Sequence, residues 1–300
     1  MKVLITGANG QLGRELLKRT PQHVTVGAYG RKQLDITNAE QVQVVFDEFQ
    51  PDTVINAAAY TKVDDAQTEQ AAAYAVNETG ASNLALAAAK VGARYLLVST
   101  DFVFDGSQGH LHRPDDTPNP QSVYGASKRA GEIAALDAIG GRTLVMRTSW
   151  LYSANGGNFV NSMLNLMRDK PELGIVADQV GSPTWAGGLA TALWRCLDYP
   201  KLSGVWHYAD AGVASWYDFA VAIQELAIER DILRHVIPIK PLSTEEFPRP
   251  APRPAFSALD SQATYKSLKL APKHWRSALA TMLEEVAQQD STETNKRAYA

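Results

Sequence analysis

The chain has 300 residues, of which 45% are hydrophobic and 20% are charged, and its formal net charge is −3. This length suggests about two domains with sizeable cores, and the weak negative charge with scattered lysine and arginine argues against nucleic acid or an anionic membrane as a partner. No apolar run approaches the ~18 residues of a membrane span, no targeting segment is visible, and the single cysteine, Cys196, indicates a reducing compartment, so we expect a cytoplasmic protein.

The first residues predict a strand, a glycine turn and a helix. The apolar run 2–6 breaks at Gly7-Ala8-Asn9-Gly10-Gln11-Leu12-Gly13 and continues as a helical pattern. At such a junction Gly7 permits the tight turn, Gly10 lets backbone amides approach a pyrophosphate, and Gly13 lets the helix pack close to the sheet. This segment predicts a dinucleotide site.

Strands and helices alternate as far as Trp150. The predicted strands are 2–6, 24–28, 53–57, 95–99 and 143–147, and the predicted helices are 11–19, 39–48, 68–74, 78–91 and 122–138. The alternation indicates an α/β fold with a doubly wound parallel sheet of the Rossmann type. We expect residues 1–150 to form the dinucleotide-binding domain, with later segments returning to it, 151–287 to form mainly a smaller substrate-binding domain, and 288–300 to be a disordered tail.

Polar groups that could carry chemistry follow the fourth predicted strand and begin the last predicted helix, whereas the small residues Ala57-Ala58-Ala59 follow the third strand. Ligands gather at the carboxyl ends of parallel strands, which places Thr100 in the crevice. Tyr124 and Lys128 lie four residues apart on one helix face, and a nearby ammonium is expected to lower the pKa of the phenol. This pair suits proton transfer to a carbonyl oxygen.

Cofactor choice is expected at the end of the second strand. The segment Gly30-Arg31-Lys32 has no acid that would bond a ribose 2′-hydroxyl, whereas Arg31 and Lys32 could pair with a 2′-phosphate. NADPH is therefore the expected cofactor, although two cations that only face solvent would look the same.

The glycine spacing and the Tyr/Lys pair resemble the short-chain dehydrogenase/reductase superfamily. Five blocks resemble one family within it, the dTDP-4-dehydrorhamnose reductases: Ser99 to Gly106, Pro120 to Lys128, Arg147 to Tyr152, Asp178 to Thr184, and Arg253 to Asp260. The resemblance implies reduction of the 4-keto group of dTDP-4-dehydro-β-L-rhamnose by NADPH, or also by NADH, to give dTDP-L-rhamnose for cell-surface polysaccharide.

The resemblance also assigns roles to residues. Tyr124 would donate the proton, Thr100 would bond the same oxygen, and Lys128 would bind the nicotinamide ribose. The cofactor-binding set is Gly7, Gly10, Gln11, Leu12, Gly13, Gly30, Arg31, Asp35, Ile36, Ala57, Ala58, Ala59, Tyr60, Thr61, Tyr124 and Lys128. The substrate-binding set is Thr61, Val63, Thr100, Asp101, Trp150 and Arg253, with Trp150 as a platform for the sugar and Arg253 on the pyrophosphate.

Simpler structural explanations stay open for several of these residues. Thr100 could only cap local backbone, Trp150 could only fill a core, and the proline-rich segment around Arg253 could be a stiff exposed loop.

Two other functions stay open. Nucleotide-sugar dehydratases of this superfamily have Thr-Asp-Glu where this chain has Thr100-Asp101-Phe102, and phenylalanine cannot transfer protons, so a reductase or an epimerase is favoured over a dehydratase. A non-catalytic NADP-binding regulatory subunit would not need Thr100, Tyr124 and Lys128 together.

No metal is predicted. Some family members dimerise around magnesium held by glutamates, and Glu15 is present, but Trp185-Ala186-Gly187-Gly188 offers no further acid. A homodimer stays open without a metal bridge. His110 and His112 have no third ligand in reach by sequence and are expected to face solvent.

Overall fold

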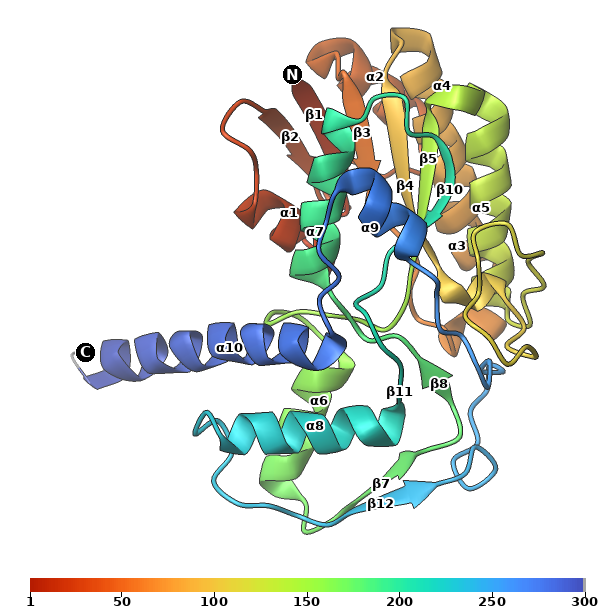
Figure 1. The fold of residues 1–300 in the computed structure, drawn as a ribbon. Helices are drawn as coiled ribbons and strands as arrows, with labels where there is room; N and C mark the ends of the chain where they lie inside the picture. The colour runs from red at the N-terminus through yellow and green to blue at the C-terminus, as the bar shows by residue number, and fades with distance from the viewer. Residues whose placement is uncertain (299–300) are drawn as a thin grey trace.

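The computed structural model describes the backbone of residues 1–298 and the side chains of residues 1–289, and it shows two lobes (Figure 1). Within these residues, the larger lobe contains a parallel sheet of six strands in the order β10-β5-β4-β3-β1-β2. The strands are β1 (Lys2–Thr6), β2 (Thr25–Tyr29), β3 (Thr53–Asn56), β4 (Arg94–Thr100), β5 (Thr143–Thr148) and β10 (Gly204–His207). The strand order reverses between β1 and β3, and the carboxyl ends of the strands point toward the smaller lobe. The predicted doubly wound sheet is confirmed.

The sheet is buried on both faces, which explains why its strands are continuously apolar. Alternate residues of one strand serve the two sides: Val3 and Ile5 pack on one face and Leu4 on the other. The first face is covered by α1 (Gln11–Lys18), α7 (Ala186–Arg195) and α9 (Gln262–Leu268), and the second by α2 (Ala39–Phe49), α4 (Ala81–Val91) and α5 (Val123–Ile139). Before α4 the chain forms α3 (Gln70–Tyr74) and a π-helical turn, Ala75–Gly80.

The sequence did not predict β10. Its four residues, Gly-Val-Trp-His, are too few to show a periodic pattern, yet they pair in parallel with β5 at the edge of the sheet. Since α7, β10 and α9 all return to the sheet, part of the segment expected to be mainly substrate-binding belongs to the larger lobe.

The smaller lobe has a core of its own. It is formed by α6 (Phe159–Asp169), α8 (Trp216–Ile228) and the first turns of α10 (Trp275–Ala298), with Met163, Phe219 and Leu279 fully or almost fully buried among them. Short paired strands complete the lobe: β7 (Leu173–Val176) with β12 (Ile239–Leu242), β8 (Val180–Gly181) with β11 (Ala214–Ser215), and β6 (Leu151–Tyr152) with β9 (Thr184–Trp185).

Most of the segment expected to be a disordered tail, 288–300, belongs to α10. The helix is anchored by Trp275, Leu279 and Leu283 in the core, and its backbone is helical as far as Ala298 (Figure 1). Residues 299–300 lie outside the described part of the chain. Among the helices of residues 1–298, none has both the length and the apolar character needed to cross a membrane.

A buried ion pair fastens α5 to the sheet. Glu132 of α5 and Arg147 of β5 are 0% and 1% exposed, and both Oε atoms of Glu132 accept hydrogen bonds of 2.8 Å from the guanidinium. Ser99 and Arg129 also donate to this carboxylate. Its pKa lies below the usual value because these hydrogen bonds outweigh the effect of burial, so the carboxylate stays charged.

Glu132→Gln is expected to destabilise the protein by about 3 kcal/mol, because it leaves the charge of Arg147 buried without a counter-charge. Urea unfolding measures the effect. Glu225→Gln is the control: it removes one partner of an exposed pair with Arg276 and should cost under about 1 kcal/mol. Equal losses in the two variants would contradict this account.

Candidate active site

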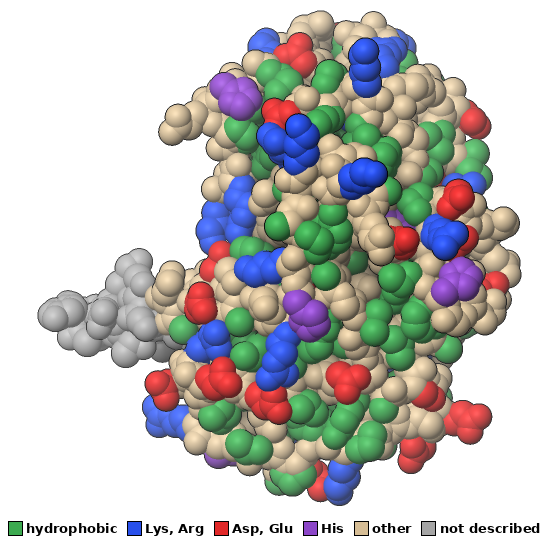
Figure 2. Space-filling model, viewed as in Figure 1, with side chains coloured by type: hydrophobic (Ala, Val, Ile, Leu, Met, Phe, Trp, Pro, Cys, Tyr) green, Lys and Arg blue, Asp and Glu red, His purple; other side chains and the backbone are tan. Residues whose placement is uncertain are grey.

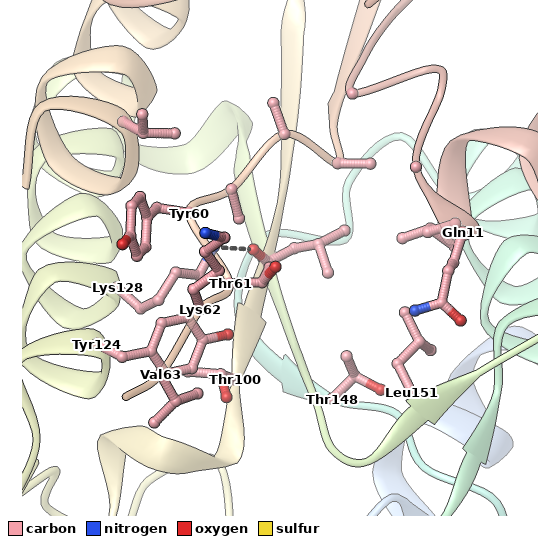
Figure 3. A pocket seen from close by; sticks show the side chains of 18 of the residues that line it. Gln11, Tyr60, Thr61, Lys62, Val63, Thr100, Tyr124, Lys128, Thr148 and Leu151 are labelled. Atoms are coloured by element: carbon pink, nitrogen blue, oxygen red, sulfur yellow. Dashed lines mark hydrogen bonds between the residues drawn. The ribbon is translucent and has the colours of Figure 1, made fainter. Parts of the chain in front are cut away.

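A cavity of about 1030 Å³ lies at the carboxyl ends of the strands and is lined by residues of both lobes. Every predicted site residue except Gly13 lines it. In the close view, Tyr124 and Lys128 project from α5 on one side, while Gln11 and Leu151 lie on the opposite side (Figure 3). The structure therefore brings together residues that are up to 246 positions apart, from Gly7 to Arg253.

The glycine turn packs so closely against neighbouring backbone that Gly7 and Gly13 have no room for a side chain. Gly7 has φ +68°, and a Cβ atom there would lie 2.6 Å from the carbonyl carbon of Ala57, which directly follows β3. A Cβ at Gly13 would lie 2.3 Å from the carbonyl oxygen of Gly7. Gly13 thus lies behind the turn and permits close helix packing, as the sequence predicted, and it does not itself line the cavity.

The first turn of α1 is open to an anion. Its N-cap, Gly10, provides no side-chain hydrogen bond, and the turn holds no acidic residue. Arg14, which the sequence analysis missed, also lines the cavity. Free amides and the positive end of the helix dipole at such a terminus suit a phosphate group.

Gln11 connects the two lobes. Its Nε2 donates to the carbonyl oxygen of Gly157 at 3.3 Å, and its Oε1 accepts from Nδ2 of Asn158 at 3.0 Å. The sequence predicted Gln11 as a cofactor contact but gave no signal for this bridge, because its partners lie almost 150 residues away.

The end of β2 presents one cation to the cavity. Arg31 is exposed and lines the cavity, whereas the adjacent Lys32 does not line it. Asp35, also in the lining, accepts hydrogen bonds from the hydroxyl and the amide of Thr37, which lower the pKa of its carboxyl. Of the two candidate cations, Arg31 is therefore the one placed to meet a 2′-phosphate.

The start of α5 sets the position of Tyr124. Ser122 caps the helix by accepting from the amide of Gly125 at 3.1 Å, and a Cβ atom at Gly125 would lie 2.1 Å from the carbonyl oxygen of Phe102. This close approach brings Tyr124 beside the end of β4, where the ring of Phe102 meets it edge-on at 5.5 Å.

The expected lowering of the Tyr124 pKa by Lys128 is wrong for this structure. Burial raises the pKa of Tyr124 to about 12, the charge of Asp101 acts in the same direction, and a hydrogen bond with Thr100 offsets part of the effect. The Lys128 Nζ instead donates to the carbonyl oxygen of Val98 at 2.6 Å. A phenol with this pKa remains protonated at neutral pH and is available as an acid.

Lys128 and Asp101 are also shifted by burial. The Lys128 side chain is 4% exposed, and burial lowers its pKa to about 8, with Glu132 acting weakly against the shift. Burial raises the pKa of Asp101 to about 6. Tyr124, Lys128 and Asp101 are therefore all shifted toward their neutral forms, as expected where water is largely excluded.

Thr100 has a local role whether or not it takes part in chemistry. Its Oγ1 accepts from the amide of Phe102 at 3.2 Å and donates to Oδ1 of Asp101 at 3.1 Å. The capping function considered from the sequence is present, and the hydroxyl also borders the cavity next to Tyr124 (Figure 3).

A pair of indoles also lines the cavity. Trp150 has a left-handed backbone, with φ 44°, and its ring stacks on Trp216 of α8 at 3.4 Å and 4°. Trp216 was missed, although Ser215-Trp216-Tyr217-Asp218 is a capping-box pattern that fixes the start of α8. Trp150 and Trp216 thus form a two-ring unit in the wall of the cavity.

Arg253 lines the cavity near Thr61 and Val63, but it already has a partner. Its guanidinium donates to both carboxylate oxygens of Asp64, at 2.9 and 3.0 Å. The sequence pointed to Arg253 but not to its partner Asp64, which comes from the loop after β3.

The residues suggested as metal ligands have other partners. Glu15 is buried and forms an ion pair with Arg19, which also lies 3.5 Å from Glu285, so this set does not fit a magnesium ion. His112 is buried and stacked on Phe104 at 4.1 Å, which corrects its expected exposure, whereas His110 is exposed. Among the residues whose side chains are described, there is no group of three potential metal ligands.

Known proteins are similar to this chain in sequence and fold over nearly its full length. A family model described as the RmlD substrate binding domain matches residues 1–288. The dTDP-4-dehydrorhamnose reductase of Aggregatibacter actinomycetemcomitans is 39% identical over 285 residues, which are 93% of this chain and 97% of the relative. This chain belongs to the dTDP-4-dehydrorhamnose reductase family.

Two further relatives add to the family assignment. The spore coat polysaccharide biosynthesis protein SpsK of Bacillus subtilis is 41% identical over 286 residues, covering 95% of this chain and 97% of the relative. A crystal structure of dTDP-4-dehydrorhamnose reductase from Bacillus anthracis in complex with NADP superposes with a TM-score of 0.88 at 37% identity, covering 95% of this chain and 99% of that chain.

For this member of the reductase family, Arg31→Ala is expected to weaken NADPH binding about tenfold and NADH binding by less than about twofold, because only NADPH carries the 2′-phosphate. Titration of protein fluorescence measures both affinities. Lys32→Ala is the matched control, since Lys32 does not line the cavity. Equal losses for the two cofactors would remove Arg31 from the 2′-phosphate site.

Proposed function

We propose that the protein reduces the 4-keto group of dTDP-4-dehydro-β-L-rhamnose with NADPH, giving dTDP-L-rhamnose for cell-surface polysaccharide. The observation that carries the proposal is the meeting of Tyr124, Lys128 and Thr100 at one side of a cavity that starts at the glycine turn. Family membership over residues 1–288 supports the same reaction.

The residues fit a bound nicotinamide dinucleotide. The turn at Gly7 and Gly10 and the uncapped start of α1 would receive the pyrophosphate, Arg31 the 2′-phosphate, and Lys128 the ribose beside the nicotinamide. Asp35 and Ile36 would flank the adenine, with Leu12, Gly30 and the 57–61 segment completing the walls. When bound, NADPH supplies the hydride.

The protein's own part in the reaction is to handle the carbonyl oxygen. Negative charge develops on this oxygen as the carbonyl carbon is reduced, and a nearby acid and hydrogen-bond donor stabilise it. Tyr124 donates the proton, and the Thr100 hydroxyl, which would turn away from Oδ1 of Asp101, donates a hydrogen bond to the same oxygen. Lys128 contributes positive charge nearby and, by binding the ribose, would hold the nicotinamide beside Tyr124.

The deoxysugar and the diphosphate of the substrate would be bound by residues from both lobes. The indole pair of Trp150 and Trp216 provides a flat apolar wall for a deoxysugar, and Arg253 provides donors for the diphosphate. Thr61, Val63 and Asp101 complete the substrate contacts.

The alternatives are less well supported. Phe102 borders the cavity beside Tyr124, where a dehydratase would need an acid. A binding-only subunit would have no use for Tyr124, Lys128 and Thr100 clustered at one side of the cavity. A cytoplasmic location remains a prediction that fits the buried lone thiol of Cys196, and a homodimer remains open. On the face seen in Figure 2, cationic and anionic side chains are interspersed.

The proposal is tested by supplying the dTDP-4-keto-sugar, made in situ from dTDP-glucose, and following the loss of NADPH absorbance at 340 nm. Formation of dTDP-L-rhamnose is the expected result, and a UDP-4-keto-sugar should react far more slowly. No reduction of the dTDP-keto-sugar, or isomerisation without net NADPH consumption, would overturn the proposal.

Tyr124→Phe is expected to lower turnover by roughly 10²–10⁴ while leaving the NADPH affinity nearly unchanged, because it removes the proton and little bulk. Single-turnover kinetics and cofactor titration measure the two quantities. Wild-type turnover in this variant, with the chemical step rate-limiting, would show that Tyr124 is not the acid.

The pH dependence should follow Lys128. Its pKa of about 8 means that the ammonium is present below pH 8 and lost as the pH rises, while Tyr124 stays protonated to about pH 12. We expect kcat/KM for NADPH to fall about tenfold per pH unit above 8, measured from pH 7 so that Asp101 is already ionised. A flat profile from pH 7 to 10 would contradict this role of Lys128.

A further inference from the structure

The contact between Asp64 and Arg253 joins two loops at the substrate end of the cavity. Asp64 directly follows the lining residue Val63, and Arg253 belongs to the proline-rich segment 248–254. Arg253 lines the cavity, whereas Asp64 does not. The carboxylate therefore holds the guanidinium from the side away from the cavity.

Counting hydrogen-bond donors shows what remains available on Arg253. A guanidinium has five N–H groups. Nη1 gives one to Asp64 and one to the carbonyl oxygen of Ala251 at 2.7 Å, and Nη2 gives one to Asp64. The structure records no hydrogen bond, within residues 1–289, for Nε–H or for the second N–H of Nη2. These two groups point the same way from one edge of the planar group, which is the arrangement that binds two phosphate oxygens at once.

We propose that Asp64 is a positioning residue for the nucleotide diphosphate: it binds Arg253 by one edge and so presents the other edge to the phosphate oxygens of the substrate. This inference rests on the proposed function, and it adds a residue that makes no contact with the substrate itself.

The loop geometry supports a positioning role over a purely stabilising one. Asp64 Oδ1 also accepts from the amide of Ala251 at 3.2 Å, so one carboxylate fixes both the guanidinium and the backbone next to it. The Asp64 and Arg253 side chains are 27% and 20% exposed, and a pair that water reaches adds little to stability. Burial alone would raise the pKa of Asp64, but hydrogen bonds from Arg253 and Ala251 outweigh it and keep the group ionised.

Two opposite effects are expected when the charge of Asp64 is removed. The attraction between the site and a diphosphate increases, because one negative charge is lost. However, Arg253 regains its rotamer freedom, so its free edge is no longer directed at the phosphate oxygens. The attraction is screened by solvent at this exposure, so the loss of orientation should dominate.

The test compares Asp64→Asn with Asp65→Asn. The asparagine side chain of the first variant keeps one oxygen for the Ala251 amide but cannot accept from both Nη atoms. Asp65 is adjacent and pairs with the exposed Lys62 instead. With NADPH present, calorimetric titration should show dTDP binding about tenfold weaker in Asp64→Asn and unchanged in Asp65→Asn, with thymidine binding and NADPH affinity unchanged in both. In turnover, KM for the keto-sugar should rise while kcat stays within about twofold.

A double-mutant cycle completes the test. If Asp64 acts through Arg253, Asp64→Asn combined with Arg253→Ala should bind dTDP no more weakly than Arg253→Ala alone. Unchanged or tighter dTDP binding in Asp64→Asn, an equal loss for thymidine, or additive losses in the cycle would each overturn the inference.

The outcomes also separate this inference from the proposed function. If Asp64→Asn weakens dTDP as expected but the wild-type protein does not reduce the keto-sugar, the proposed reaction fails and the role of Asp64 stands. If the wild-type protein reduces the keto-sugar and Asp64→Asn binds dTDP normally, the proposed reaction stands and the role of Asp64 fails. A wild-type protein that binds no dTDP overturns both.

Discussion

The arrangement of the site depends on how firmly α5 is held against the sheet. The buried pair of Glu132 and Arg147 joins the middle of this helix to β5, and Ser99 on β4 donates to the same carboxylate. Tyr124 and Lys128 lie on the two turns that precede Glu132, so their positions relative to the strand ends follow from this contact. A buried pair of this kind adds little net stability, but it defines one orientation of the helix.

The division into two lobes gives the cavity its two kinds of wall. The larger lobe contributes backbone: tight glycines, strand ends and the free amides of α1, which suit a dinucleotide of fixed shape. The smaller lobe contributes side chains, of which Trp216 is the clearest, and these suit recognition of a particular sugar. Gln11 connects the two walls through hydrogen bonds to the 157–158 segment.

Burial has a consistent effect on the chemistry. It raises the pKa of Tyr124 to about 12 and lowers that of Lys128 to about 8. The first shift keeps the proton that a reduction must deliver, and the second makes the supporting charge sensitive to pH in the weakly alkaline range. Spacing along a helix suggested a direct effect of the ammonium on the phenol, whereas the structure directs the ammonium at the carbonyl oxygen of Val98.

The sequence by itself determined the elements whose signals are local. The glycine turn, five of the strands and the alternation with helices follow from residue order, because strand periodicity, glycine placement and caps act over a few positions. Resemblance to a family added most of the other predicted site residues, but the cavity is also lined by residues that were not predicted, such as Arg14 and Trp216. Tertiary structure alone decided the contacts between distant segments: β10 beside β5, Trp216 on Trp150, Asp64 on Arg253, and Arg147 under α5. These pairings leave no local pattern, since each depends on where the folded chain brings two segments together and on how much water it excludes there.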